Sequence, residues 1–225
     1  MTSGVPKTLF TPMFEDFVEA TRDATNRWYD LDHVPQRLTC PGFLRAERYE
    51  LASRASSGSG AGALRYLNVY YIADPDVLRS EAYRRQVPAH TPWAMRRSDS
   101  GASGRYLRGV WVQQVAAVPT RTAHMLPTEG PRTWWLRMHE VEGEDMGAIM
   151  SCPGILGADR YASVEIDLPG PPGQRSPAYM TIYDLESPEL VTTPEFAWYA
   201  DDGVVWQGVY QQRPSPWTSR PIARS

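Results

Sequence analysis

The stretch Thr39–Tyr49 reads TCPGFLRAERY and returns 112 positions later as Ser151–Tyr161, SCPGILGADRY. Further along the chain, Tyr66–Tyr70 (YLNVY) returns 113 positions later as Tyr179–Tyr183 (YMTIY). A period near half of the chain length is too long for a solenoid unit. The repeated stretches therefore indicate two copies of one small domain.

The two copies differ in length at two places. Met13-Phe14-Glu15 aligns with Met138-His139-Glu140 at an offset of 125, which falls to 112 at the Cys-Pro-Gly turn, so the second copy lacks 13 residues before that turn. Gly109–Gln113 returns as Gly208–Gln212 at an offset of 99, so 14 more residues are missing there. The extra material of the first copy includes 28–33 and 88–93. We therefore expect a single functional pocket, located in the first copy.

Hydrophobic spacing and turn residues predict the order βαββαβ in each copy. Strands are expected over 7–14, 44–49, 65–73, 106–115, 133–141, 155–166, 178–185 and 204–213, and helices over 16–38, from Asp74 onward, 142–151 and 188–199. Residues 1–120 and 121–225 then each form a ferredoxin-like unit whose helices cover one face of its sheet. The two bare sheet faces need partners and would pack together. The predicted fold is α+β, with two fused ferredoxin-like repeats forming a pseudo-two-fold α+β barrel.

The composition excludes several classes of protein. The chain has 225 residues, of which 42% are hydrophobic and 22% charged, as in an ordinary globular protein. A net charge of −3 provides no basic patch for nucleic acid or an anionic membrane. An apolar run near 18 residues and a signal-peptide core are both absent from the sequence, which predicts a cytoplasmic protein.

The cysteines and histidines do not predict a metal site. Cys40 and Cys152 occupy equivalent positions in the two copies, so we expect each to pack locally as a free thiol. The four histidines show no metal-ligand spacing relative to one another or to the cysteines, and they are His33, His90, His124 and His139. The expected protein needs no cofactor, with haem as the alternative.

One part of the sequence resembles a known family. Trp28-Tyr29-x-x-Asp32-His33-Val34-Pro35, followed by Pro41-Gly42-Phe43 and Arg48-Tyr49, is similar to the dimeric α+β barrel superfamily, especially its EthD-like and methylmuconolactone-isomerase-like branch. The resemblance is clear over 26–93 and degenerate over 133–213. It implies the fold rather than one activity, since the superfamily includes cofactor-free isomerases, polyketide cyclases, decarboxylases, quinone-forming monooxygenases and haem-binding members.

His33 is the leading catalytic candidate, because an imidazole exchanges a proton near neutral pH. Asp32 lies close enough to orient it, Tyr29 offers a hydroxyl, and the second copy has Asp145 at the matching position. The alternative is a histidine that only stabilises the C-terminal end of a helix through its interaction with the helix dipole. The candidate substrate-binding residues are Trp28, Arg48, Tyr66, Asn68, Tyr70, His90 and Trp93.

Each of these candidates also has a structural interpretation. Trp28 fits core packing, and Arg48, which shares a strand face with Ala46, needs a buried carboxylate or carbonyl partner whether or not it binds substrate. The row Tyr66, Asn68 and Tyr70 suits either the contact between sheets or a pocket wall. His90 and Trp93 fit either a pocket rim or a surface loop.

The first functional hypothesis is a small cofactor-independent lyase or isomerase of secondary metabolism. It would decarboxylate, cyclise or shift a proton in an aromatic, polyketide-like or lactone substrate, with His33 as general acid or base. The second is a haem-dependent or cofactor-free monooxygenase, and the third a non-catalytic ligand-binding or scaffold barrel. The expected partner is a small molecule, with a homodimer left open.

Overall fold

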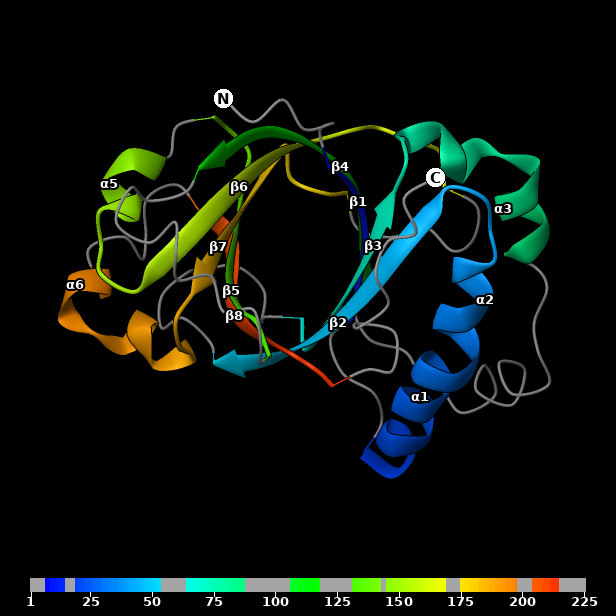
Figure 1. Cartoon of the computed structure of the whole chain (residues 1–225), viewed down its shortest axis with the longest axis horizontal. Helices are drawn as coiled ribbons and strands as arrows, with labels where there is room; N and C mark the ends of the chain where they lie inside the picture. Colours follow the sequence, from blue (N-terminus) through cyan, green and yellow to red (C-terminus); the bar gives the residue numbers. More distant parts are fainter. Residues whose placement is uncertain are drawn as a thin grey trace.

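The strands close into one antiparallel barrel. The computed structural model describes residues 7–14, 19–53, 64–87, 106–117, 131–142, 145–168, 175–197 and 204–214. Around the barrel the strands follow the order β1-β3-β2-β8-β5-β7-β6-β4. Four neighbouring strands come from the first half of the chain and four from the second, and helices flank the barrel on two opposite sides (Figure 1). The predicted α+β barrel is confirmed.

The elements of the first half agree with the predicted order. Its strands are β1 Thr8–Phe14, β2 Phe43–Ser53, β3 Tyr66–Ile72 and β4 Tyr106–Ala117. Its helical segments are η1 Glu19–Thr21, α1 Arg22–Trp28, the π-turn η2 Tyr29–His33, α2 Val34–Leu38, η3 Pro75–Arg79 and α3 Glu81–Gln86. Asp74 caps η3 by accepting a hydrogen bond from the Asp76 backbone N–H at 2.8 Å.

The second half has the same sequence of strands and shorter helices. Its strands are β5 Thr133–His139, β6 Ile155–Ser163, β7 Tyr179–Leu185 and β8 Val204–Gln212. Its helical segments are α5 Met146–Met150, η4 Pro188–Thr192 and α6 Pro194–Ala197. Asp145, which lies 112 positions after His33, caps α5 by accepting from the Ala148 N–H at 3.0 Å. None of the described helices is long and apolar enough to cross a membrane.

Alternation along the strands divides the side chains between the barrel lumen and the outer faces. The lumen is a packed core with contributions from all eight strands, including Leu9, Tyr49, Leu67, Trp111, Trp134, Tyr161, Met180 and Tyr210. Tyr49 and Trp134 stack across the two halves with ring centroids 4.0 Å apart. The described side chains of the lumen therefore pack against one another as a core.

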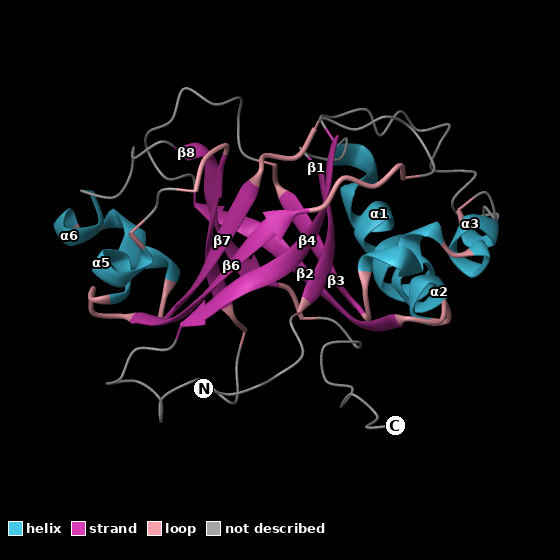
Figure 2. Cartoon of the chain, turned by 90° about the horizontal axis from the view of Figure 1, so that it is seen from above, coloured by secondary structure: helices cyan, strands magenta, loops and turns pink. Residues whose placement is uncertain are grey.

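The helices cover the outer faces of the two half-sheets, on opposite sides of the barrel (Figure 2). On the first half, α1 to α3 enclose an aromatic cluster that includes Phe10, Trp28, Tyr29, Phe43, Tyr70 and Tyr83. On the second half, α5 and α6 enclose a smaller cluster around Trp135, Tyr183 and Phe196. The longer helical layer of the first half agrees with the extra residues expected there.

The first long helix departs from its prediction. Even spacing of Phe17, Ala20, Ala24 and Trp28 predicted one buried face along a helix over 16–38, but Ala24 is exposed and the neighbouring Thr25 is buried. The π-turn η2 interrupts the helix, and the Val34 N–H bonds back to the Tyr29 carbonyl. A π-turn shifts the side chains around the axis. Hydrophobic spacing does not reveal this shift, which affects the residues after Trp28. Ala24 lies before the π-turn, and its exposure shows that the buried face of α1 passes through Thr25 and Trp28 instead. Phe17 lies outside the described residues.

Candidate functional site

The π-turn brings the leading candidates together. Trp28 ends α1, and Tyr29 and His33 begin and end η2. The imidazole of half-buried His33 lies 4.5 Å from the Trp28 ring and 5.1 Å from the Tyr29 ring, centroid to centroid. Trp28 and Tyr29 are buried, with 5% and 3% of their surface exposed. Two buried rings therefore hold one face and one edge of a more exposed imidazole, and π-turns of this kind are frequent at functional sites.

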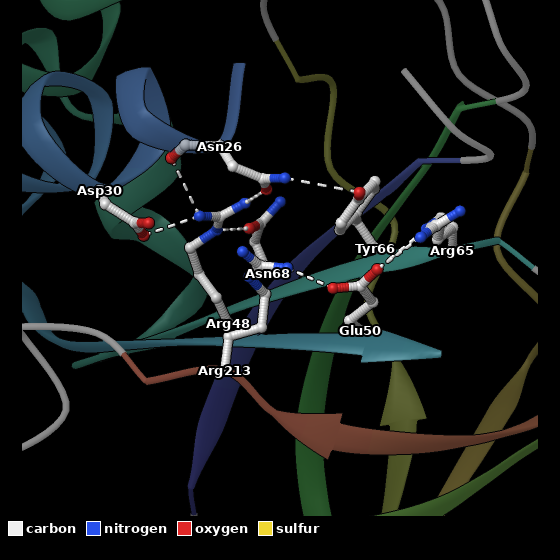
Figure 3. A network of polar contacts seen from close by, with 8 residues as sticks. All are labelled: Asn26, Asp30, Arg48, Glu50, Arg65, Tyr66, Asn68 and Arg213. Carbon is white, nitrogen blue, oxygen red and sulfur yellow. Dashed lines mark hydrogen bonds and ion pairs between the residues drawn. The ribbon is translucent and has the colours of Figure 1, made fainter. Parts of the chain in front are cut away.

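Arg48 fastens this turn to the sheet. Its guanidinium donates to the Asp30 carboxylate at 2.6 Å, to the Asn26 side-chain oxygen at 2.7 Å and to the Asn68 side-chain oxygen at 3.0 Å (Figure 3). It also lies 4.8 Å above the Tyr29 ring. The expected carboxylate partner of Arg48 is thus Asp30, and the contacts of the guanidinium together link α1 and η2 to β2 and β3.

The predicted row on β3 lies on the outer face, and each member is buried. The Tyr66 hydroxyl accepts from Asn26 at 3.4 Å, and Asn68 donates to the Pro12 carbonyl at 3.4 Å. Tyr70 stacks on Phe10 at 5.9 Å and meets the edge of Phe43 at 5.6 Å. The row therefore faces the first-half helices and not the opposite sheet. Its contacts support the helical layer, and substrate binding by Tyr66, Asn68 and Tyr70 stays a prediction.

Beside this row, Glu50 of β2 binds arginines that directly precede β3 and directly follow β8. Its carboxylate accepts from Arg65 at 2.8 Å and also from Arg213, while the Arg213 backbone N–H bonds the Arg48 carbonyl at 2.8 Å (Figure 3). The last described residues of the second half therefore reach the outer face of the first half. This contact adds to the connection between the halves near Arg48.

A cavity of about 420 Å³ opens on the same outer face, at β4. Its walls are Arg108, Val110, residues 163–168, Arg175 and Ser176. We name residues 163–168 the strap, because they leave β6 and cross toward the first-half helices (Figure 2). Alternate strap residues Val164, Ile166 and Leu168 pack against the aromatic cluster that contains Trp28 and Tyr29. The cavity and the histidine therefore border one cluster.

The cavity combines apolar walls with charged groups. Arg108 is half-buried, whereas Glu165, Asp167 and Arg175 are exposed. Burial raises the pKa of the Tyr83 hydroxyl in the adjoining cluster, and the positive charges of Arg37 and Arg108 oppose that rise. The field of Arg108 therefore extends into the cluster, where a half-buried charge is screened less than an exposed one.

The cavity differs from the expected pocket in its walls. The single functional pocket was expected in the first half, whereas this cavity takes most of its lining from the second half. His90 and Trp93 lie outside the described residues, so their role stays a prediction. Sequence reasoning missed Arg108 and the strap. The alternation of Val164, Ile166 and Leu168 was its available signal, but it was interpreted as the end of a strand over 155–166.

The described residues of the cavity and of the wider site do not favour haem or a metal ion. Haem takes histidine, cysteine, methionine or tyrosine as its axial ligand, and the wall of the 420 Å³ cavity contains none of these residue types. Haem therefore does not fit this cavity. Across the described ranges, no group of three or more histidine, cysteine, aspartate or glutamate side chains is arranged to hold a metal ion.

Comparison with known proteins finds the fold but no family. No family model and no curated protein matches the sequence. The chain aligns over 99% of its length with 98% of an anthrone oxidase-like protein, at 9% identity and a TM-score of 0.59. A mutant chlorite dismutase from Candidatus Nitrospira defluvii aligns over 92% of this chain and 91% of its own, at 12% identity and a TM-score of 0.48. Similarity at such low identity shows the shared fold alone.

Proposed function

We propose that the chain is an enzyme that moves a proton on an aromatic, polyketide-like or lactone substrate, with His33 as the general acid or base. The observation that carries the proposal is the imidazole held between Trp28 and Tyr29 on a π-turn. The turn is itself anchored through the ion pair of Asp30 with buried Arg48. A positioned imidazole with an accessible edge suits proton transfer near neutral pH.

In this proposal the neighbours of His33 position it and polarise the substrate. Asp32 orients the imidazole, and the Tyr29 hydroxyl donates to an oxyanion that develops as the proton leaves carbon. The simplest outcomes are a proton shift, a cyclisation or a decarboxylation. Such a cofactor-independent lyase or isomerase remains the first candidate. It needs only groups that the chain itself supplies.

A second candidate is a cofactor-free monooxygenase, which the name of the anthrone oxidase-like structural relative favours. Removal of a proton by His33 would leave an electron-rich carbanion that reacts with dioxygen. The overall change converts a CH₂ group and O₂ into a C=O group and water, so dioxygen is the oxidant. Both candidates begin with the same step at His33. They differ in whether dioxygen is consumed.

Anthrone is a suitable probe, because exchange and oxidation are measured on the same CH₂ group. Without oxygen, we expect the protein to accelerate exchange of this CH₂ for deuterium in D₂O, observed by NMR. With oxygen, consumption of O₂ and formation of quinone identify the monooxygenase. His33→Ala should slow exchange by about 10²–10⁴-fold, the usual contribution of a positioned acid–base group. His33→Gln should be equally slow.

The same variants distinguish a structural histidine. If His33→Ala lowers the melting temperature but leaves the exchange rate per folded molecule unchanged, His33 serves only the fold. A wild-type rate that shows no inflection near the pKa range of histidine also contradicts the proposal. Absence of any accelerated exchange or oxidation favours the non-catalytic ligand-binding barrel.

We further propose that the barrel arose by tandem duplication of a ferredoxin-like unit, with residues 1–120 and 121–225 as the two repeats. Strand order supports this, since β2-β3-β1-β4 of the first half corresponds to β6-β7-β5-β8 of the second. Hydrogen bonds at equivalent residues support it as well. The Tyr49 hydroxyl donates to Glu47, and the Tyr161 hydroxyl donates to Asp159. Donor and acceptor of the second bond each lie 112 positions after those of the first.

A further inference from the structure

The walls of the 420 Å³ cavity are fixed by hydrogen bonds between the two halves. The Val164 N–H of the strap donates to the Val110 carbonyl of β4 at 2.8 Å. On the other side, the Ser176 hydroxyl donates to the Arg108 carbonyl at 2.7 Å. The Ser163 N–H donates to the Ala178 carbonyl at 2.8 Å, which ties the start of the strap to the segment that carries Ser176. The cavity is therefore a built feature of the joined halves.

Apolar and acidic side chains alternate along the strap. Val164, Ile166 and Leu168 are half-buried against the aromatic cluster, while Glu165 and Asp167 between them are exposed. Val110, Val164, Ile166 and Leu168 supply the apolar part of a wall that also contains charged and hydroxyl side chains. Glu165 and Asp167 also line the cavity, but both residues are exposed, so water screens their charges. A planar molecule that combines an apolar ring with a polar group suits this mixed wall, and 420 Å³ is within the usual range for small-molecule sites.

Of the two arginines that line the cavity, Arg175 is exposed and Arg108 is the less exposed. It is half-buried on the outer face of β4, and its charge influences the pKa of Tyr83 in the adjoining cluster. Its counterpart in the second half is Gln207, which accepts a hydrogen bond from the Trp135 indole at 3.2 Å. The arginine is thus particular to the half in which this cavity opens. A guanidinium on a partly dry wall favours an oxyanion.

We propose that this cavity binds a planar aromatic molecule that carries an oxyanion, with Arg108 as the group that anchors the charge. The strap packs the ring, and the second half of the chain thereby selects the ligand for the first half. The identification of this ligand as the substrate rests on the proposed function of His33. The binding itself does not, because it is measured without turnover.

The probes are 2-naphthoate and its neutral amide, 2-naphthamide, which share the same ring. Isothermal titration should show that the wild type prefers 2-naphthoate. Arg108→Met should weaken naphthoate binding by about 10- to 100-fold, the usual worth of a hydrogen bond to a charged group, and leave the amide unchanged. Arg108→Lys should restore part of the preference. Arg85→Met, which removes an exposed arginine from α3, is the matched control and should bind as the wild type does.

A second variant tests the position of the ligand. Ile166→Trp fills the cavity from the strap and should abolish binding of both probes, with circular dichroism and melting temperature retained. Equal affinity for the acid and the amide, unchanged binding by Arg108→Met or Ile166→Trp, or no saturable binding to the folded protein overturns the inference. His33→Ala should bind naphthoate normally. The two proposals are therefore tested separately. Loss of turnover with intact binding in His33→Ala tests the role of His33, and loss of binding with intact turnover in Arg108→Met tests the role of Arg108.

Discussion

Arg48 determines how the candidate site is attached to the barrel. Only 2% of its side chain is exposed, yet it is charged, so its location requires partners that replace water. Asp30 supplies the opposite charge, and Asn26 and Asn68 supply further acceptors. The sequence predicted that an arginine beside Ala46 needs a carboxylate or carbonyl. It did not identify Asp30, because that choice depends on how the π-turn is oriented.

Replacing Arg48 should therefore destabilise the protein. Arg48→Met leaves Asp30 without its charged partner, and removing one member of a buried pair typically costs about 3–5 kcal/mol in free energy of unfolding. We expect a loss near the lower value, since 22% of the Asp30 side chain is exposed. Urea unfolding measures it. Arg79→Met breaks an exposed pair with Asp76 and should cost less than about 1 kcal/mol. Equal losses in the two variants would contradict the structural role of Arg48.

At the scale of elements, the Cys-Pro-Gly turn is where sequence and structure agree most closely. Gly42 and Gly154 have φ angles of +92° and +88°, a region that favours glycine. A Cβ at Gly42 would lie 2.4 Å from a Val77 methyl, and a Cβ at Gly154 would lie 2.8 Å from a Leu190 methyl. Turn residues encode such local geometry directly. The π-turn, by contrast, has no local sequence signature that hydrophobic spacing could reveal, so a continuous helix over 16–38 was predicted in its place.

Alanine at either turn should be costly. Gly42→Ala and Gly154→Ala combine a strained backbone with a close contact, so each should lower the free energy of unfolding by about 1–3 kcal/mol. Gly157→Ala is the control within β6, because its Cβ would meet only ordinary contacts at 3.5 and 3.6 Å. Chemical denaturation of the three variants measures their free energies of unfolding. A similar stability of Gly42→Ala and Gly157→Ala would show that the turn tolerates a side chain.

For the whole molecule, the lumen makes each half depend on the other. Tyr49 stacks on Trp134, the Tyr210 hydroxyl donates to the Leu64 carbonyl at 2.6 Å, and Lys7 pairs with Asp159 at 2.6 Å. The sequence predicted this barrel, because its repeated strands leave two apolar faces that need each other. The cavity could not be predicted in the same way, since it forms where the strap of one half meets β4 of the other.

Separating the halves should consequently expose the lumen. We expect residues 1–120 expressed alone to aggregate or self-associate, because Leu9, Leu67 and Trp111 would lose their cover of apolar side chains from the second half. Co-expression with residues 121–225 should yield a one-to-one complex, detected by analytical ultracentrifugation. This complex should also regain binding of 2-naphthoate, because the strap and Arg108 come from different halves. A folded, monomeric first half that binds naphthoate by itself would contradict both the shared core and the shared cavity.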